Sequence, residues 1–310
     1  MFLGRRDVTI LAAILAQIVH SVLMLAAAPV VSGVRDGVQA RLAGRTGPDF
    51  GQPWRDLRRM IRKQPALAET ATLLPRIAPV ACFAAAALAA MLVPSFTLGM
   101  ALAPYSDLLV VAGLLAASRI VVALAALDAG TAPAGLAAGR SARLACLAEP
   151  TLYLAIFVFG VLGGTTNVDL LCGLRLQGML QPVAAAMLAV AALALAALAG
   201  PGEPGLTAEF SGADLALVQL SDALGQLVWL SLLAGLLLPA GMAKPGDGPL
   251  GWVIGLLAWG AKILVLTACL AALRAAFGGF RPSRRPLALG IAAILGLLAA
   301  LLVLASAVAA

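Results

Sequence analysis

The chain has 310 residues, of which 62% are hydrophobic and 11% are charged, and its mean hydropathy is +1.03. A soluble domain carries about 25% charged residues, so this composition excludes an ordinary soluble protein and predicts an all-α polytopic membrane protein. The net charge of +7 comes from loops between apolar runs, and the absence of any nucleic-acid-binding motif argues against a nucleic-acid partner.

Apolar runs long enough to cross a bilayer, about 20 residues each, recur along the whole chain. We expect eight spans within a single integral membrane domain, residues 1–310. The expected spans are 9–32, 78–99, 108–127, 144–164, 180–200, 217–239, 252–273 and 287–309. The first run is too long for the apolar part of a signal peptide, so we expect it to be retained.

Basic residues are concentrated on one side of the predicted membrane. Fifteen Lys or Arg residues lie in the loops of that side, whereas the opposite side has four. The fifteen occupy loops 33–77, 128–143, 201–216 and 274–286. Because cytoplasmic loops are enriched in Lys and Arg, we expect these loops in the cytoplasm, both termini outside, and the protein in the bacterial cytoplasmic (inner) membrane.

The loop at 33–77 is the most charged part of the chain, with nine basic residues and four acids. A basic loop next to a membrane span offers a docking surface. Six of its cations fall within nineteen residues: Arg45, Arg55, Arg58, Arg59, Arg62 and Lys63. Helical spacing would place four of these on one face. We expect them to contact an acidic face of a soluble partner; contact with lipid headgroups is the alternative.

Cofactor chemistry has little support in the residues. Cys82, Cys146, Cys172 and Cys269 are scattered and form no CxxC motif, so we expect no iron–sulfur or zinc ligation by this chain. His20 sits in the middle of a span, where it could serve as a proton relay or as a hydrogen-bonding residue between helices. Nucleotide-binding and nucleophile motifs are absent, which favours a non-catalytic chain.

Charged residues inside the predicted spans are the candidates for proton coupling. Glu149 lies about five residues into its span, roughly 8 Å deep, and Arg119 and Lys262 fall at a similar depth. Intramembrane charges are costly and usually paired. We therefore expect a Glu149–Arg119 or a Glu149–Lys262 pair, with Asp128 nearby at the loop, and the pair could be structural or functional.

Three segments, in order along the chain, resemble one family. Segment 39–64 is similar to the first cytoplasmic loop of NADH dehydrogenase subunit 1, which joins the two arms of complex I, and is closer to the formate hydrogenlyase subunit 4 family of group 4 [NiFe] hydrogenases. The matching residues are Gln39, Arg41, Arg45, Gly47, Pro48, Gln52, Pro53, Asp56 and Leu57. The other similar segments are 127–140, which is followed by 147–150, and 208–217.

The resemblance implies a membrane-anchor subunit. Its basic loops, with Arg140, would seat a soluble iron–sulfur subunit resembling a hydrogenase small subunit, with a large subunit above and antiporter-like membrane subunits beside it in the lipid bilayer. Iron–sulfur clusters and a Ni–Fe centre would belong to those partners, and the resemblance leaves quinone binding open. Glu209, in the third segment, joins Glu149, Asp128, Arg119 and Lys262 as a proton-coupling candidate.

The chain departs from the family pattern at three acidic positions. Ser141 stands where relatives have a glutamate, and no Asp or Glu follows Asp247. The acidic loop before the sixth span is shortened, and the acids left around it are Glu203, Glu209 and Asp214. A proton wire needs titratable groups within reach of one another, so we expect docking to be retained and proton coupling to be weakened.

Two other functions stay open. A membrane scaffold could dock soluble proteins without redox coupling. A secondary transporter would require polar helices broken by Gly or Pro in corresponding halves of the chain, whereas the expected spans are mostly unbroken and the largest polar feature is a loop.

Overall fold

The computed structural model describes residues 5–65, 72–180, 183–199, 204–244, 247–276 and 285–309. Ten α-helices and two 3-10 turns are found in these ranges. They are α1 (Arg5–Leu42), α2 (Gln52–Ile61), α3 (Leu74–Leu92), η1 (Ala103–Tyr105), α4 (Leu108–Asp128), α5 (Ala132–Gly163), α6 (Val168–Leu176), α7 (Val183–Ala199), η2 (Pro204–Leu206), α8 (Gly212–Leu237), α9 (Pro249–Ala276) and α10 (Arg285–Ala309).

Eight of these helices correspond to the eight expected spans. Seven of those described are long and apolar enough to cross a membrane, namely α1, α3, α4, α5, α8, α9 and α10. The eighth, α7, is shorter but apolar throughout, and it occupies the expected span 180–200. The predicted all-α polytopic membrane class is confirmed.

Two helices extend well beyond their predicted boundaries. The first continues to Leu42, ten residues into the expected loop 33–77, and α5 already begins at Ala132, twelve residues before the predicted start of its span. Hydropathy detects only the apolar part of a helix, whereas a helix can project from the bilayer with charged residues on its surface. Residues 132–143 are therefore helical rather than part of a loop.

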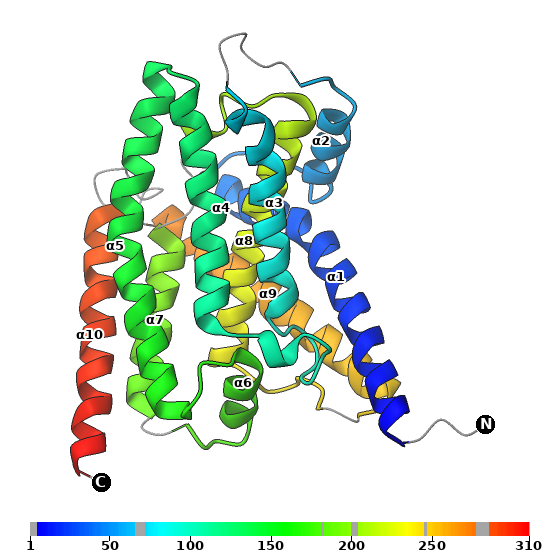
Figure 1. The fold of residues 1–310 in the computed structure, drawn as a ribbon, viewed down its shortest axis with the longest axis vertical. Coiled ribbons are helices and arrows are strands. Elements are labelled where there is room, and N and C mark those ends of the chain that lie inside the picture. Colours follow the sequence, from blue (N-terminus) through cyan, green and yellow to red (C-terminus); the bar gives the residue numbers. More distant parts are fainter. Residues whose placement is uncertain are drawn as a thin grey trace.

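The helices form one bundle around α8 (Figure 1). This helix is the most enclosed span, with 67% of its apolar window buried. On one side α5, α7 and α10 pack together, and on the other α1 packs against α9, while α3 and α4 complete the bundle. The α2 helix and the α4–α5 connection lie at one end, which we call the α2 end. The start of α1 and the end of α10 lie at the opposite end, which we call the termini end.

Local sequence signals set several helix ends. The Asp107 carboxylate accepts a hydrogen bond from Leu109 N at 2.7 Å and caps α4, and the Thr131 hydroxyl accepts one from Ala134 N at 3.4 Å and caps α5. Gly164 ends α5 with φ of +62°, a left-handed conformation that glycine adopts without strain. These residues fix the start of α4 and both ends of α5.

The midspan histidine joins two helices. His20 of α1 is fully buried, and its ring nitrogens lie 2.7 Å from Ser95 Oγ and 2.9 Å from Ala90 O. A carbonyl can only accept, so Nε2 donates to Ala90 O. The His20 ring thus links α1 by hydrogen bonds to α3, at Ala90, and to the segment that follows α3, at Ser95.

Membrane orientation can be tested at the α2 end. Gln64 is exposed there, and the basic bias predicts that this end faces the cytoplasm. In a variant whose four native cysteines are replaced by alanine, Gln64→Cys should resist a membrane-impermeant maleimide added to intact cells and react once the cells are permeabilised. Ready labelling in intact cells would invert the predicted topology.

Candidate functional site: a basic shelf above a charged cavity

The basic loop folds into a short amphipathic helix fixed against α1. Pro53 stands in the first turn of α2, where its missing N–H costs nothing, and Leu57 is buried beneath the helix. The chain passes α1 at very short range: a methyl group added at Gly33 would lie 2.8 Å from Phe50 O, and one added at Gly47 would lie 2.9 Å from Gly37 O. We call α2 with Arg62 and Lys63 the basic shelf.

The cations of the basic shelf differ in their partners. Arg55 forms an ion pair with Asp49 at 2.9 Å, and Arg59 pairs with Asp56 at 3.3 Å. Arg58, Arg62 and Lys63 are exposed and form no ion pair with the described residues.

Several family-type residues of this loop shape it. Gln52 Nε2 donates to Asp56 Oδ1 at 3.1 Å within α2, and the guanidinium of Arg41 lies 5.3 Å from the centre of the Phe50 ring. Pro48 follows the close approach at Gly47, and Arg45 is exposed beside it. These contacts fix the loop and leave the cations outside.

The far end of the shelf abuts the central helix. Gly212, the first residue of α8, has φ of +58°, and a methyl group added to it would lie 2.7 Å from both Lys63 O and Gln64 O. Only glycine suits this conformation and this approach. The shelf is therefore packed directly on the helix that carries the polar residues described next.

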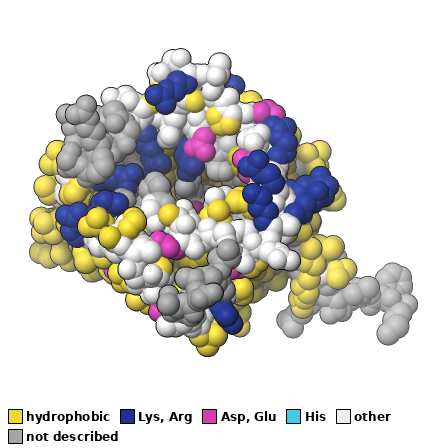
Figure 2. Space-filling view, turned by 90° about the horizontal axis from the view of Figure 1, so that it is seen from above, with side chains coloured by type: hydrophobic (Ala, Val, Ile, Leu, Met, Phe, Trp, Pro, Cys, Tyr) yellow, Lys and Arg dark blue, Asp and Glu magenta, His cyan; other side chains and the backbone are white. Residues whose placement is uncertain are grey.

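A cavity of about 500 Å³ lies between the shelf and the bundle. Its wall is formed by α1, α2, α8, α9 and α10, and its charged residues are Arg35, Asp36, Asp56, Asp222, Arg274 and Arg285. Viewed onto the α2 end, Lys and Arg side chains surround a central hollow (Figure 2). We call this cavity the chamber.

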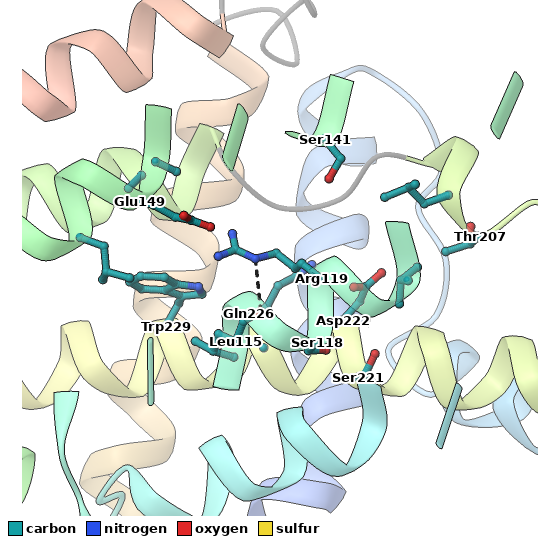
Figure 3. A pocket seen from close by; sticks show the side chains of 16 residues that line it. Leu115, Ser118, Arg119, Ser141, Glu149, Thr207, Ser221, Asp222, Gln226 and Trp229 are labelled. Carbon is teal, nitrogen blue, oxygen red and sulfur yellow. Dashed lines mark hydrogen bonds between the residues drawn. The ribbon is translucent and has the colours of Figure 1, made fainter. Parts of the chain in front are cut away.

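A smaller cavity of about 80 Å³ adjoins the chamber, between α4, α5 and α8. We call it the small cavity, and we call the chamber and the small cavity together the charged cavity. Asp222 and Gln226 of α8 line both spaces, and the smaller one adds Arg119 of α4 and Glu149 of α5 (Figure 3). The Arg119 guanidinium points toward Glu149, and its Nε donates to Leu115 O at 3.3 Å. The predicted meeting of Arg119 and Glu149 is thus found, as neighbours across a cavity rather than as a close ion pair.

Charges of alternating sign link four helices here. Arg35 of α1 binds Asp36 at 2.8 Å and donates to Gln226 Oε1. Asp222 interacts electrostatically with both Arg35 and Arg119, and Arg119 interacts with both Asp222 and Glu149. The Asp222 side chain is exposed where it lines the chamber, although protein surrounds much of it.

Our reading of the sequence missed Asp222, Arg35 and Gln226 as members of this site. Asp222 lies within an apolar run, and a lone acid inside a span is a functional candidate by itself. The sequence predicts Arg35 only as a loop cation, because the expected loop begins at residue 33. Only the fold brings these three side chains to Arg119 and Glu149.

Ser141 stands at the entrance to a second opening. It lines the small cavity and also a lateral cavity of about 210 Å³ between α4 and α5, which shares Arg119 and Glu149. The position where the family resemblance implies a glutamate therefore lines the small cavity, and here it carries only a hydroxyl.

Three other candidates lie outside the charged cavity. Asp128 accepts hydrogen bonds from Thr72 N at 3.1 Å and Thr72 Oγ1 at 2.9 Å. Glu209 accepts one from Thr131 Oγ1 at 2.5 Å. Arg140 is exposed on α5, beside η2. Asp128 and Glu209 therefore tie loops together at the α2 end, and Glu203 lies outside the described residues.

The expected Glu149–Lys262 alternative is wrong. Lys262 Nζ donates to Ala240 O at 2.5 Å, beyond the C-terminus of α8, and Lys262 is not part of the charged cavity. The equal depth inferred from residue counting failed because α5 starts earlier than predicted and α9 is tilted across the bundle (Figure 1).

The termini end is closed by polar contacts between loops. Asp169 of α6 accepts the Gly99 N–H at 3.0 and 3.2 Å through its two oxygens, and Arg175 Nε donates to Leu236 O at 3.3 Å. Burial raises the pKa of the Asp169 carboxyl, and the Gly99 hydrogen bond partly offsets this rise. These contacts hold α6 under the bundle.

Comparison with known proteins gives a consistent result. The family model described as NADH dehydrogenase matches residues 14–306. Hydrogenase-4 component C of Escherichia coli K12 is 29% identical over 244 residues, covering 74% of this chain and 77% of the relative. Formate hydrogenlyase subunit 4 of the same organism is 26% identical over 244 residues, covering 74% and 80%.

A solved structure shares the fold. It is that of the membrane-bound sulfane sulfur reductase, an archaeal respiratory membrane complex. One of its chains superposes with a TM-score of 0.72 at 20% identity, covering 93% of this chain and 98% of that one.

Proposed function

The chain belongs to the NADH dehydrogenase family, and we propose that it is the membrane-anchor subunit of a hydrogenase-type, complex-I-like redox complex. In this role it docks a soluble iron–sulfur subunit on the basic shelf. Its relatives hydrogenase-4 component C and formate hydrogenlyase subunit 4 carry the names of such complexes. The single observation that supports docking is the rigid shelf of exposed cations over an open chamber.

Charge favours a protein partner on the shelf. Arg58, Arg62 and Lys63 lack ion pairs with the described residues, whereas Arg55 and Arg59 already have them. Clustered exposed cations attract an acidic surface and orient it. The contacts at Gly33, Gly47 and Gly212 hold the shelf still, which lowers the entropy lost when a partner binds.

The partners supply the redox chemistry in this proposal. The chain itself carries no cofactor, while iron–sulfur clusters and a Ni–Fe centre reside in the soluble small and large subunits. Antiporter-like membrane subunits pack beside it in the bacterial inner membrane. The chamber lies directly beneath the proposed partner, with Asp56 of α2 and Asp222 of α8 in its wall.

Proton coupling through this chain is limited in this proposal. The polar cavities run from the α2 end to Glu149 and Gln226. Beyond Gln226, α8 continues for about 16 Å, at 1.5 Å per residue. Apart from the half-buried Trp229, its residues from Leu227 to Leu236 are buried, and all are apolar except Ser231, whose Oγ accepts from Trp259 Nε1.

Purification of the native complex through a tag on this chain tests the proposal. We expect an iron–sulfur subunit and a hydrogenase-like large subunit to co-purify, together with antiporter-like membrane proteins, as identified by mass spectrometry and metal analysis. Substrate uptake by the isolated chain in vesicles, with no soluble partner recovered, would instead indicate a transporter. Soluble partners without redox centres would indicate a scaffold.

A further inference from the structure

Two intramembrane acids face a single arginine in the small cavity. Glu149 comes from α5, Asp222 from α8 and Arg119 from α4. We propose that Glu149 and Asp222 share Arg119 and hold one proton between them, so that the guanidinium pairs with whichever acid is ionised. Arg119 is then a positioning residue that links the two protonation states. This inference goes beyond the proposed docking function and is tested separately from it.

Among the described residues, Arg119 is the cation that lines the small cavity together with both acids. Arg35, the other guanidinium near Asp222, is already bound to Asp36 and Gln226. Arg274 and Arg285 line the chamber together with Asp56 but not the small cavity. On α3, the Cys82 sulfur accepts a 3.4 Å hydrogen bond from Ser221 Oγ, the residue before Asp222. An ionised carboxylate without a counter-charge is costly at membrane depth, which favours one proton on the pair.

The geometry allows Arg119 to change partner. The close ion pairs in the described part of the chain do not include it, and its one hydrogen bond is to the backbone of its own helix, at Leu115 O. The surrounding cavity of about 80 Å³ has room for a few waters, each occupying roughly 30 Å³ in the liquid. A proton can therefore leave one carboxyl and reach the other through water while the guanidinium moves the opposite way.

The two acids differ in their access to the chamber, and we therefore assign them different roles in proton exchange. Asp222 faces the chamber, whereas Glu149 lies at the inner cavity and the lateral opening between α4 and α5. Asp222 exchanges protons with the chamber, and Glu149 receives them when Arg119 turns to Asp222. The pair thus acts as a single-proton exchange site rather than as two independent acids.

Infrared difference spectroscopy of the full chain in lipid nanodiscs tests this sharing at neutral pH. Glu149→Gln and Asp222→Asn should each remove the same protonated-carboxyl signal, equal to one acid, because either change leaves one acid for Arg119. Arg119→Met should double that signal, and Arg119→Lys should restore it to one acid. Asp214→Asn, an acid of α8 outside the cavity, is the matched control and should leave it unchanged.

Independent titration of the two acids would overturn the proposal. In that case only one of the two acid variants, or neither, would lose the signal. An Arg119→Met spectrum identical to wild type would overturn it as well. The readout needs no soluble partner, so failure of this proposal is distinguishable from failure of the docking function, which is measured by co-purification.

Discussion

Reversing the charges of Arg58 and Arg62 to glutamate is expected to release the proposed soluble iron–sulfur partner while the chain stays inserted in the membrane. Both side chains are exposed on the basic shelf and lack ion pairs with the described residues. Their positive charges can therefore interact with acidic residues of a partner. Replacing attraction by repulsion at two interface charges should cost about 3 kcal/mol, or roughly 100-fold in affinity. Co-purification and titration of the soluble subunit onto nanodisc-embedded chain measure the loss.

Two controls separate docking from general damage. Arg58→Lys with Arg62→Lys keeps the charge and should retain most of the partner. Lys244→Glu reverses an exposed charge at the termini end and should leave docking unchanged. If the glutamate variant still binds the partner but binds anionic vesicles less tightly, the shelf contacts lipid headgroups instead, and the docking assignment fails.

The spans were predictable because their physics is local. About 20 apolar residues make a span wherever they occur, and the run expected at 180–200 contains the helix α7. The ends were less predictable because hydropathy is silent about helix outside the bilayer. For this reason the first helix ends at Leu42, ten residues after the predicted end of its span, and α5 begins at Ala132, twelve residues before the predicted start of its span.

The charged cavity was only half predictable, because it depends on how helices pack. Arg119 and Glu149 could be paired from the rule that intramembrane charges find partners, and the structure does bring them together. The same rule offered Lys262, which instead binds Ala240 O. The depth of a residue in its span does not show which helix its side chain faces. Asp222 was not predicted as part of the site because it belongs to no recognised motif.

The finding of Asp222 changes what the missing acids mean. Ser141 places a hydroxyl in the cavity wall where the family resemblance implies a carboxylate, but a second carboxylate, that of Asp222, lines the same space as Glu149. The site therefore keeps two acids and one guanidinium at the α2 end. Beyond Gln226, α8 adds no titratable residue toward the termini end, and most of its buried side chains there are leucines.

Vesicles that contain this subunit and its soluble partners, without antiporter-like subunits, should therefore show redox turnover with little acidification. A proton needs water or titratable groups to cross roughly 30 Å of hydrocarbon, and about 16 Å of α8 beyond Gln226 offers only Ser231, already bound to Trp259. The measurement is a pH-sensitive dye inside the vesicles, followed during turnover and compared with a sample treated with protonophore. The two traces should agree.

Glu149→Gln gives this experiment its decisive comparison. The substitution keeps the size of the side chain and removes its titratable group, so docking and turnover should persist if the cavity only exchanges protons locally. Robust acidification in the wild type that Glu149→Gln abolishes would show that the chain does carry protons across. A third outcome is that acidification appears only when antiporter-like subunits are added and is reduced by Glu149→Gln or Asp222→Asn. This result would assign transmembrane proton movement to those subunits and local proton exchange to this cavity. That last outcome is the one expected, because the lateral opening between α4 and α5 reaches Glu149 from the side, whereas the path along α8 is apolar.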